Sequence, residues 1–254
     1  MAGQNVISLE TIKVACQNCS LSALCLPMTL TPEDVTRLDN IIERNRPLHR
    51  GDYLHSEGDP FERLRVVTTG SIKTYSTSDD GSERILGFHL PGELIGLEAI
   101  ENSRHRCSAK ALETTLICEI PFDALEQLSH ETPSLQHQLY RLLSREIGHE
   151  TEILMLLGKK GADERVATFL MSLSERFKGR GFSASDFYLS MSRFDISNYL
   201  GLAVETVSRI FTRFQDEGLI NAKRKHVQLL NLARLQEIAD GNHHKGRSQR
   251  GYHS

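Results

Sequence analysis

The chain has 254 residues, of which 39% are hydrophobic and 25% charged, and its formal net charge is −3. This length suffices for about two domains with their own cores, and the composition is ordinary for a globular protein. Its apolar runs are shorter than the ~20 residues of a membrane span, and its N-terminus lacks the basic start and apolar stretch of a signal peptide. We therefore expect a cytoplasmic protein without membrane contact, whose thiols stay reduced.

Charge is divided unevenly along the chain. Residues 161–254 carry fourteen Lys or Arg against ten Asp or Glu, a net charge of +4, whereas residues 1–160 carry −7. A basic half favours contact with nucleic acid, although an imbalance of a few charges is also common on solvated surfaces. Charge alone therefore indicates where nucleic acid would bind, without establishing that it does.

Three of the five cysteines, Cys16, Cys19 and Cys25, lie within ten residues, and Cys118 stands in an apolar run about ninety residues later. The Cys-x2-Cys-x5-Cys spacing suits an iron-sulfur cluster or a soft metal, and one remote cysteine can complete four ligands. Structural zinc is an alternative, although zinc usually takes two close pairs of ligands. Cys118 as a small core residue, or a redox pair at Cys16 and Cys19, are further alternatives, but no thioredoxin-like pattern surrounds that pair.

Short β-rich runs separated by glycines occupy residues 46–121. This pattern predicts a β-sandwich or jelly roll with no catalytic motif on it. The segment Ser78–Ser82 contains Asp-Gly and predicts a hairpin turn. Leu86, Phe88 and Leu90 alternate with more polar neighbours, so we expect them on one face. The expected strands include Leu64–Thr68, Ser71–Thr77 and Glu83–Leu90.

A long helix is predicted after Pro133, running to about Gly158. Apolar residues at seven-residue spacing indicate a coiled-coil seam, for which a parallel homodimer is the economical partner. Glu150 is the exception: in a two-fold dimer it would face its own copy, so that repulsion weakens the dimer until another event compensates it. The alternative is that Glu150 lies solvated at the rim of the seam. The expected dimerisation residues are Tyr140, Leu143, Ile147, Glu150, Leu154 and Leu157.

After a hinge at Gly158–Gly161, an amphipathic helix is predicted from the stripe Val166, Phe169, Leu170, Leu173 and Phe177. The segment Ser192–Arg209 then has the pattern helix, glycine turn, helix. Gly201 permits the positive φ of the turn. The residues that can close a small core around it are Ile196, Leu200, Val204, Val207 and Phe211.

The opposite face of the second helix presents polar side chains suited to DNA. Arg can pair with guanine and Glu can accept from cytosine in the major groove, although Glu205 and Arg209 could instead form a surface ion pair. A hairpin follows around Lys223-Arg224-Lys225, whose cations suit phosphate contacts. Together these features predict a winged helix-turn-helix that binds double-stranded DNA. The expected DNA-binding residues are Glu205, Ser208, Arg209 and Thr212.

Three phrases of the sequence, with this order of segments, carry a resemblance to a known family. They are Gly-Phe-His-Leu-Pro-Gly-Glu-Leu at 87–94, Cys-Glu-Ile-Pro-Phe at 118–122 and Tyr-Leu-Gly-Leu-Ala-Val-Glu-Thr-Val-Ser-Arg at 199–209. Across about residues 12–240 the chain resembles the FNR/ANR anaerobic regulators of the CRP/FNR superfamily. The resemblance implies an α+β architecture: a cyclic-nucleotide-binding-like β-roll, a long dimerisation helix and a C-terminal winged helix-turn-helix.

The resemblance also implies an oxygen-labile [4Fe-4S] cluster held by Cys16, Cys19, Cys25 and Cys118, with Cys107 outside the ligand pattern. It implies base reading by Glu205, Ser208 and Arg209 on a two-fold site of the TTGAT-N4-ATCAA type. Loops at Asp79–Glu83 and around Phe182 are similar to the family's surfaces for RNA polymerase. The protein would then be a global regulator of anaerobic genes and not an enzyme.

The expected domains are 1–29 (cysteine segment), 30–130 (β-roll), 131–160 (dimerisation helix), 161–240 (DNA-binding domain) and 241–254 (disordered tail). A regulator that binds a cyclic nucleotide is the main alternative function. In such relatives an Arg-Ser pair binds the phosphate, whereas here Cys107 separates Arg106 from Ser108. A zinc-stabilised regulator is a second alternative. An iron-sulfur electron carrier is a third, but the chain has no flavin or nucleotide fingerprint.

Overall fold

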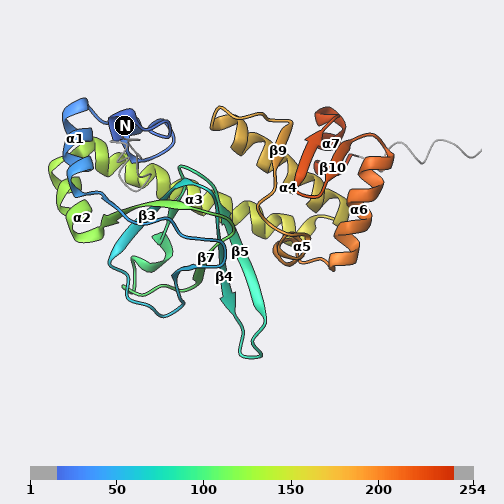
Figure 1. Cartoon of the computed structure of the whole chain (residues 1–254), viewed down its shortest axis with the longest axis horizontal. Helices are drawn as coiled ribbons and strands as arrows, with labels where there is room; N and C mark the ends of the chain where they lie inside the picture. Colours follow the sequence, from blue (N-terminus) through green and yellow to red (C-terminus); the bar gives the residue numbers. More distant parts are fainter. Residues whose placement is uncertain (1–15, 243–254) are drawn as a thin grey trace, which may run out of the picture. The chain divides into compact units, whose positions relative to one another are not determined.

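The structure, a computed structural model, describes residues 16–242 (Figure 1). The chain divides into two compact units: the first covers residues up to 77 and 87–143, the second residues 78–86 and those from 144 onward. The tail predicted at 241–254 lies, after Asn242, outside the described residues. Within the described part of the chain, no helix has the length and apolarity needed to cross a membrane.

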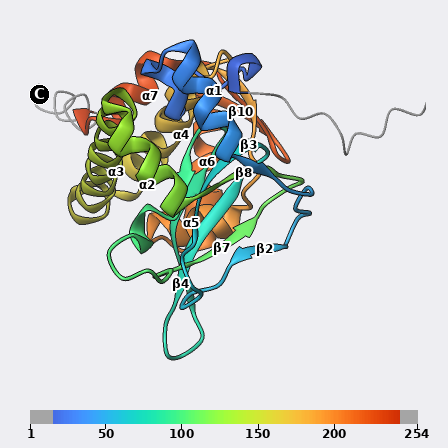
Figure 2. The ribbon, with the colours of Figure 1, turned by 90° about the vertical axis from the view of Figure 1, so that its left-hand side faces the viewer.

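Two four-stranded sheets form the β-roll, which confirms the predicted jelly-roll architecture. The first has the order β1-β8-β3-β6 and the second β2-β7-β4-β5. Figure 2 labels β3 and β8 of the first sheet and β2, β7 and β4 of the second. In the first sheet the strands are β1 (Glu43–Arg44), β8 (Leu116–Pro121), β3 (Arg63–Thr69) and β6 (Leu94–Ile95), paired antiparallel. In the second they are β2 (Tyr53–His55), β7 (Ser108–Ala111), β4 (Ile72–Thr77) and β5 (Glu83–His89).

Small and branched apolar side chains fill the interior of the β-roll. The largest fully buried members include Ile72 and Ile95. Phe88 on β5 and Leu90, directly after the end of β5, are buried as predicted. Leu86 is instead 48% exposed, and its neighbour Ile85 is buried. The expectation that Leu86 shares their face is therefore wrong, because the two-residue alternation breaks at Gly87.

The first unit also contains the helices α1 (Pro32–Ile41) and α2 (Phe122–Glu131). Helix α3 (Pro133–Lys159) begins in the first unit and continues into the second. Thr31 caps α1 by accepting from the Asp34 N–H, and α1 lies beside α2 (Figure 1). A single apolar core joins residues from these helices and the first sheet. Its buried members are Leu26, Leu38, Leu64, Val66, Leu94, Ile120, Leu125, Leu128, Leu135 and Leu142, and Cys25 and Cys118 pack against it.

The second unit contains a helix-turn-helix followed by a small sheet, as predicted. Its helices are α4 (Ala162–Gly179), α5 (Arg193–Leu200), α6 (Val204–Asp216) and α7 (Leu232–Ala239). The three-stranded sheet has the order β10-β11-β9, from Ile220–Lys223, His226–Leu229 and Asp186–Tyr188. Helix α7 packs on α4. Strand β9, which has no clear signal in the sequence, adds a third strand to the expected wing.

Local sequence explains the turn between α5 and α6. Ser192 and Asp195 form a reciprocal capping box that begins α5. Gly201 ends α5 in the left-handed region, with φ of 62°, and donates its N–H to the carbonyl of Asn198 at 3.2 Å. A side chain at this φ would strain the backbone, so glycine fixes the angle between the two helices.

The tip of the β4–β5 hairpin belongs to the second unit because it is hydrogen-bonded to α5. Arg84 Nη1 donates to the carbonyl of Asn198 at 2.9 Å, and the Ile85 N–H donates to Asn198 Oδ1 at 2.7 Å. Asn198 Nδ2 in turn donates to the Glu83 carbonyl at 2.6 Å. The amide of one asparagine of the helix-turn-helix thus pairs with the backbone of this strand at Glu83 and Ile85.

Candidate functional site

All four predicted ligands, Cys16, Cys19, Cys25 and Cys118, line one cavity in the first unit. Its volume of about 30 Å³ exceeds the ~10–15 Å³ that one water molecule needs, so the four cysteines line an open space. The rest of the lining is mostly apolar, from Leu26, Ile42, Val66 and Ile120 among others. All five cysteines of the chain are free thiols.

The cysteine loop, residues 16–25, is shaped by its own backbone and fixed by apolar anchors. The Cys19 N–H donates to the Cys16 carbonyl at 3.3 Å, and the Cys25 N–H donates to the Leu21 carbonyl at 3.1 Å. Gly92 approaches the loop so closely that a Cβ there would lie 3.1 Å from Leu24 Cβ. The loop is therefore packed closely on the β-roll through contacts that do not involve its thiols.

Burial favours the neutral form of two of these thiols, Cys16 and Cys118. It raises the pKa of Cys16 far above its ordinary value, and the Asp39 carboxylate raises it further. Burial also raises the pKa of Cys118, while the Arg44 guanidinium opposes that rise. Thiolates grouped here need a cation to stabilise them, which is what a metal or an iron-sulfur core supplies. The donor set therefore fits the predicted cluster.

Cys107 lies apart from this cavity. Its side chain is buried, and its Sγ lies 3.8 Å from Glu98 Oε1 as a donor. Burial, and then the Glu98 charge, raise the pKa of the Cys107 thiol to about 12. Since Cys107 is absent from the cavity lining among the described residues, the geometry supports the predicted set of four over one that contains it.

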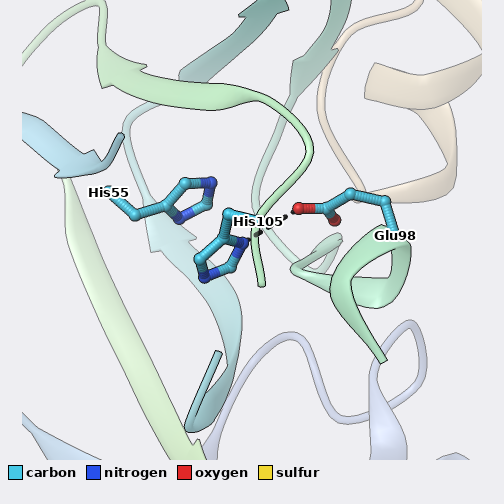
Figure 3. A group of neighbouring side chains, drawn as sticks. All are labelled: His55, Glu98 and His105. Atoms are coloured by element: carbon cyan, nitrogen blue, oxygen red, sulfur yellow. Dashed lines mark hydrogen bonds and ion pairs between the residues drawn. The ribbon is translucent and has the colours of Figure 1, made fainter. Parts of the chain in front are cut away.

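A second group of possible metal ligands, which sequence reasoning missed, is formed by His55, Glu98 and His105 (Figure 3). The imidazole rings stack with centroids 3.5 Å apart and planes 6° from parallel. His105 Nδ1 lies 2.9 Å from Glu98 Oε1, a donor–acceptor distance. Arg65 Nη1 lies 3.3 Å from His105 Nε2 and 3.5 Å from His55 Nδ1.

The contacts of Arg65 determine which histidine nitrogens carry protons and whether the group can bind a metal ion. Arginine can only donate, so the two nitrogens that face it accept, and the protons lie on His105 Nδ1 and His55 Nε2. A metal-binding histidine normally donates from its second nitrogen, which here faces a donor. Two parallel rings also cannot both point their lone pairs at one ion. The group therefore fits a cation poorly, and burial lowers the pKa of His55 to about 3, which keeps it neutral.

Helix α6 has one buried apolar face and one exposed polar face, as the sequence predicts. Val207 and Phe211 are buried, together with Ile210 and Phe214. Every predicted DNA-binding side chain is exposed, and within the described residues no ion pair joins Glu205 to Arg209. Ser208 and Thr212 donate to carbonyls one turn earlier, at 2.9 and 3.1 Å, and their oxygens remain able to accept. The exposed set is Glu205, Ser208, Arg209 and Thr212.

The β10–β11 hairpin carries exposed cations at its turn, Lys223, Arg224 and Lys225. Arg224 adopts a φ of 56°, a left-handed conformation that closes this tight turn. Three cations on one hairpin suit contacts to phosphate oxygens rather than to base edges. The second unit therefore presents a helix that can read bases and a wing that can bind the backbone.

Helix α3 has one uncovered apolar face. Tyr140, Ile147 and Leu154 are 59%, 64% and 71% exposed, and Glu150 is exposed as well. The remaining predicted dimerisation residues, Leu143 and Leu157, are half-buried. Side chains this large and apolar at seven-residue spacing suit packing against a second helix.

Comparisons with known proteins agree with this arrangement. Residues 45–132 match the family model of the cyclic nucleotide-binding domain, and residues 164–238 match that of the Crp-like helix-turn-helix domain. The transcriptional activator protein anr of Pseudomonas aeruginosa is 53% identical, over 91% of this chain and 98% of its own. The fumarate and nitrate reduction regulatory protein of Yersinia pestis is 46% identical, over 89% and 90%.

The chain belongs to the FNR/ANR-type regulators of the CRP/FNR superfamily. Among solved structures, FixK2 from Bradyrhizobium japonicum covers 77% of this chain and 97% of its own, with 31% identity and a TM-score of 0.71. This FNR/ANR-type protein is thus a DNA-binding transcriptional regulator and not an enzyme.

Sequence reasoning missed the residues around the predicted ligands of this FNR/ANR-type regulator. Asp39 and Arg44 lie beside Cys16, and the signal that could have found them is weak, because isolated charged residues at a helix end or on a short strand are common. The buried histidine pair was also missed, since His55 and His105 are fifty residues apart and share no motif.

Proposed function

We propose that this regulator senses oxygen through a [4Fe-4S] cluster bound by Cys16, Cys19, Cys25 and Cys118. With the cluster intact it would dimerise and bind a two-fold DNA site of the TTGAT-N4-ATCAA type to control anaerobic genes. The observation that carries the proposal is the single cavity lined by all four thiols. Bound there, the cluster supplies oxygen-labile bonds that join the loop to β8.

The chain's own residues provide a route from the loop to α3. Leu26, next to the last loop cysteine, is fully buried in the core that also contains Leu135 and Leu142 of α3. Gln138 of α3 donates from Nε2 to the Cys25 carbonyl at 3.2 Å. Its Oε1 is buried and lacks a partner within the described residues. A shift of the loop would therefore change the packing of the helix whose other face is proposed to dimerise.

Dimerisation would place two copies of α6 one helical turn apart on a two-fold DNA site. Glu205, Ser208 and Arg209 would read base edges, with Thr212 at the end of the same face, while the wing cations would hold phosphates. RNA polymerase would contact the loop at Asp79–Glu83 and the surface around Phe182, which is 58% exposed. Reduced thiols and DNA binding favour the cytoplasm as its location.

The decisive test is the iron, acid-labile sulfide and visible spectrum of protein purified without oxygen and then exposed to air. We expect about four irons and four sulfides per chain, the composition of the cluster, and a broad visible band that bleaches in air. Zinc alone, or no metal after strictly anaerobic preparation, would contradict the proposal. Micromolar cyclic AMP binding by calorimetry would then favour the alternative suggested by the match at residues 45–132.

Glu150 is expected to weaken the dimer when no cluster is bound. Changing Glu150 to Ala removes the carboxylate that would face its own copy, so the monomer fraction of the cluster-free protein should fall. Analytical ultracentrifugation measures that fraction. Glu152→Ala is the matched control, because Glu152 is also exposed but two residues away, on the opposite side of the helix. Equal monomer fractions in wild type and Glu150→Ala would sink the idea.

A further inference from the structure

Two charged side chains outside the ligand set contact the cysteine site. Asp39 lies in the last turn of α1, and its Oδ1 accepts the Cys16 N–H at 3.0 Å. Arg44 lies on β1 directly opposite Cys118 of β8 in the antiparallel register. Arg44 Nη2 donates to Asp39 Oδ1 at 2.5 Å and lies 3.9 Å from Cys16 Sγ. A single guanidinium thus adjoins two of the four predicted ligands.

The pair is well placed to act electrostatically. The Arg44 and Asp39 side chains are only 18% and 24% exposed, so solvent screens their charges less than on an open surface. Among the described residues that line the cavity, none is charged. An arginine guanidinium keeps its positive charge in proteins, and the hydrogen bond to Asp39 holds it in place. Arg44 is therefore the positive charge next to this otherwise apolar site.

We propose that Arg44, oriented by Asp39, is a positioning residue of the cysteine site that stabilises its thiolates and slows the loss of iron in air. The inference rests on the proposed function. Four thiolates around a [4Fe-4S] core of formal charge +2 carry a net charge of −2. When dioxygen takes an electron from such a site, the site becomes one charge less negative and dioxygen becomes superoxide. A fixed positive charge favours the more negative form and so opposes that step.

Asp39 has two roles in this arrangement. Its carboxylate fixes the guanidinium, and it also holds the backbone of Cys16, the first cysteine of the loop. The charge of Asp39 itself disfavours thiolate at Cys16, because it raises the pKa of that thiol. The carboxylate therefore positions the site, and the stabilising charge comes from Arg44.

The test compares wild type with Arg44→Gln and Arg44→Lys after anaerobic reconstitution with iron and sulfide. Iron per chain, the bleaching rate in air-saturated buffer and the reduction potential are measured. We expect Arg44→Gln to bleach about tenfold faster, the lower end of the effect typical of residues that support metal ligands. Its potential should shift to more negative values, because loss of a positive charge disfavours the reduced form. Arg44→Lys should recover most of both properties.

Arg63→Gln is the matched control. Arg63 also pairs with a carboxylate, Glu43, at 2.5 Å on the same sheet, but unlike Arg44 it makes no contact with a cysteine sulfur among the described residues. This variant should behave as wild type. If wild type holds iron and Arg44→Gln has the same bleaching rate and potential as wild type, the role of Arg44 alone is overturned. If Arg44→Lys bleaches as fast as Arg44→Gln, the charge explanation is overturned. Wild type that holds no iron would instead overturn the proposed function together with this inference.

Discussion

Replacing Cys118 with Ser is expected to remove the cluster and, with it, specific DNA binding under anaerobic conditions. Cys118 supplies the thiol that connects the loop to β8, and a serine hydroxyl is a poor substitute for a thiolate toward iron. Serine is close in size to cysteine, so the β-roll should fold normally. Iron should fall from about four per chain to near zero, and an anaerobic gel shift with the two-fold site should show no specific complex.

Cys107→Ser provides the matched control for that experiment. Both cysteines lie in the β-roll unit, but Cys107 contacts Glu98 rather than the cavity. The Cys107→Ser protein should keep wild-type iron and bind the same DNA. The opposite outcome, full iron in Cys118→Ser and loss of iron in Cys107→Ser, would exchange the two cysteines in the ligand set.

Replacing Arg209 with Ala should give the second largest effect, a loss of preference for the correct DNA sequence. An arginine paired with two guanine acceptors contributes about 1–3 kcal/mol of discrimination, and a dimer would lose that contact at both half-sites. Arg209 is exposed on α6 and stands opposite the buried Phe214 side, so its loss should leave the fold intact. Quantitative anaerobic binding to the two-fold site and to single-base variants measures the loss.

Lys225→Ala separates base reading from phosphate binding. Lys225 is exposed at the turn of the β10–β11 hairpin. Loss of a phosphate contact should weaken binding to all sequences nearly equally and reduce the salt-dependence slope by about one per contact. Arg209→Ala should instead relax preference at one base position. If Arg209→Ala weakened all sequences equally, its assignment to base reading would be wrong.

The sequence predicted the parts of the fold that have strong local patterns. The β-roll strands appeared as short apolar runs separated by turn residues, and the α3–α4 break followed from Gly158 and Gly161. Gly201 marked the turn of the helix-turn-helix because a left-handed φ favours glycine. In each case a few neighbouring residues determine the structure, so one sequence suffices to find it.

What the sequence could not show depends on long-range pairing. Arg44 reaches the cysteine site only because β1 pairs with β8, residues more than seventy positions later. The Arg65 side chain meets His55 and His105 through a comparable arrangement of distant segments. Helix α1 was missed for a different reason: its buried face has only Val35 and Leu38, too few for a clear helical period.

The packing of the cysteine loop also bears on how often one molecule could respond. Leu21 and Leu26 are 7% and 0% exposed, so apolar burial anchors the loop independently of its thiols. Binding a new cluster would then require little ordering of the chain, because most of that entropy is already lost. If the proposed function holds, an existing molecule could regain its cluster when oxygen disappears, and recovery would be limited by cluster supply rather than by synthesis of new protein.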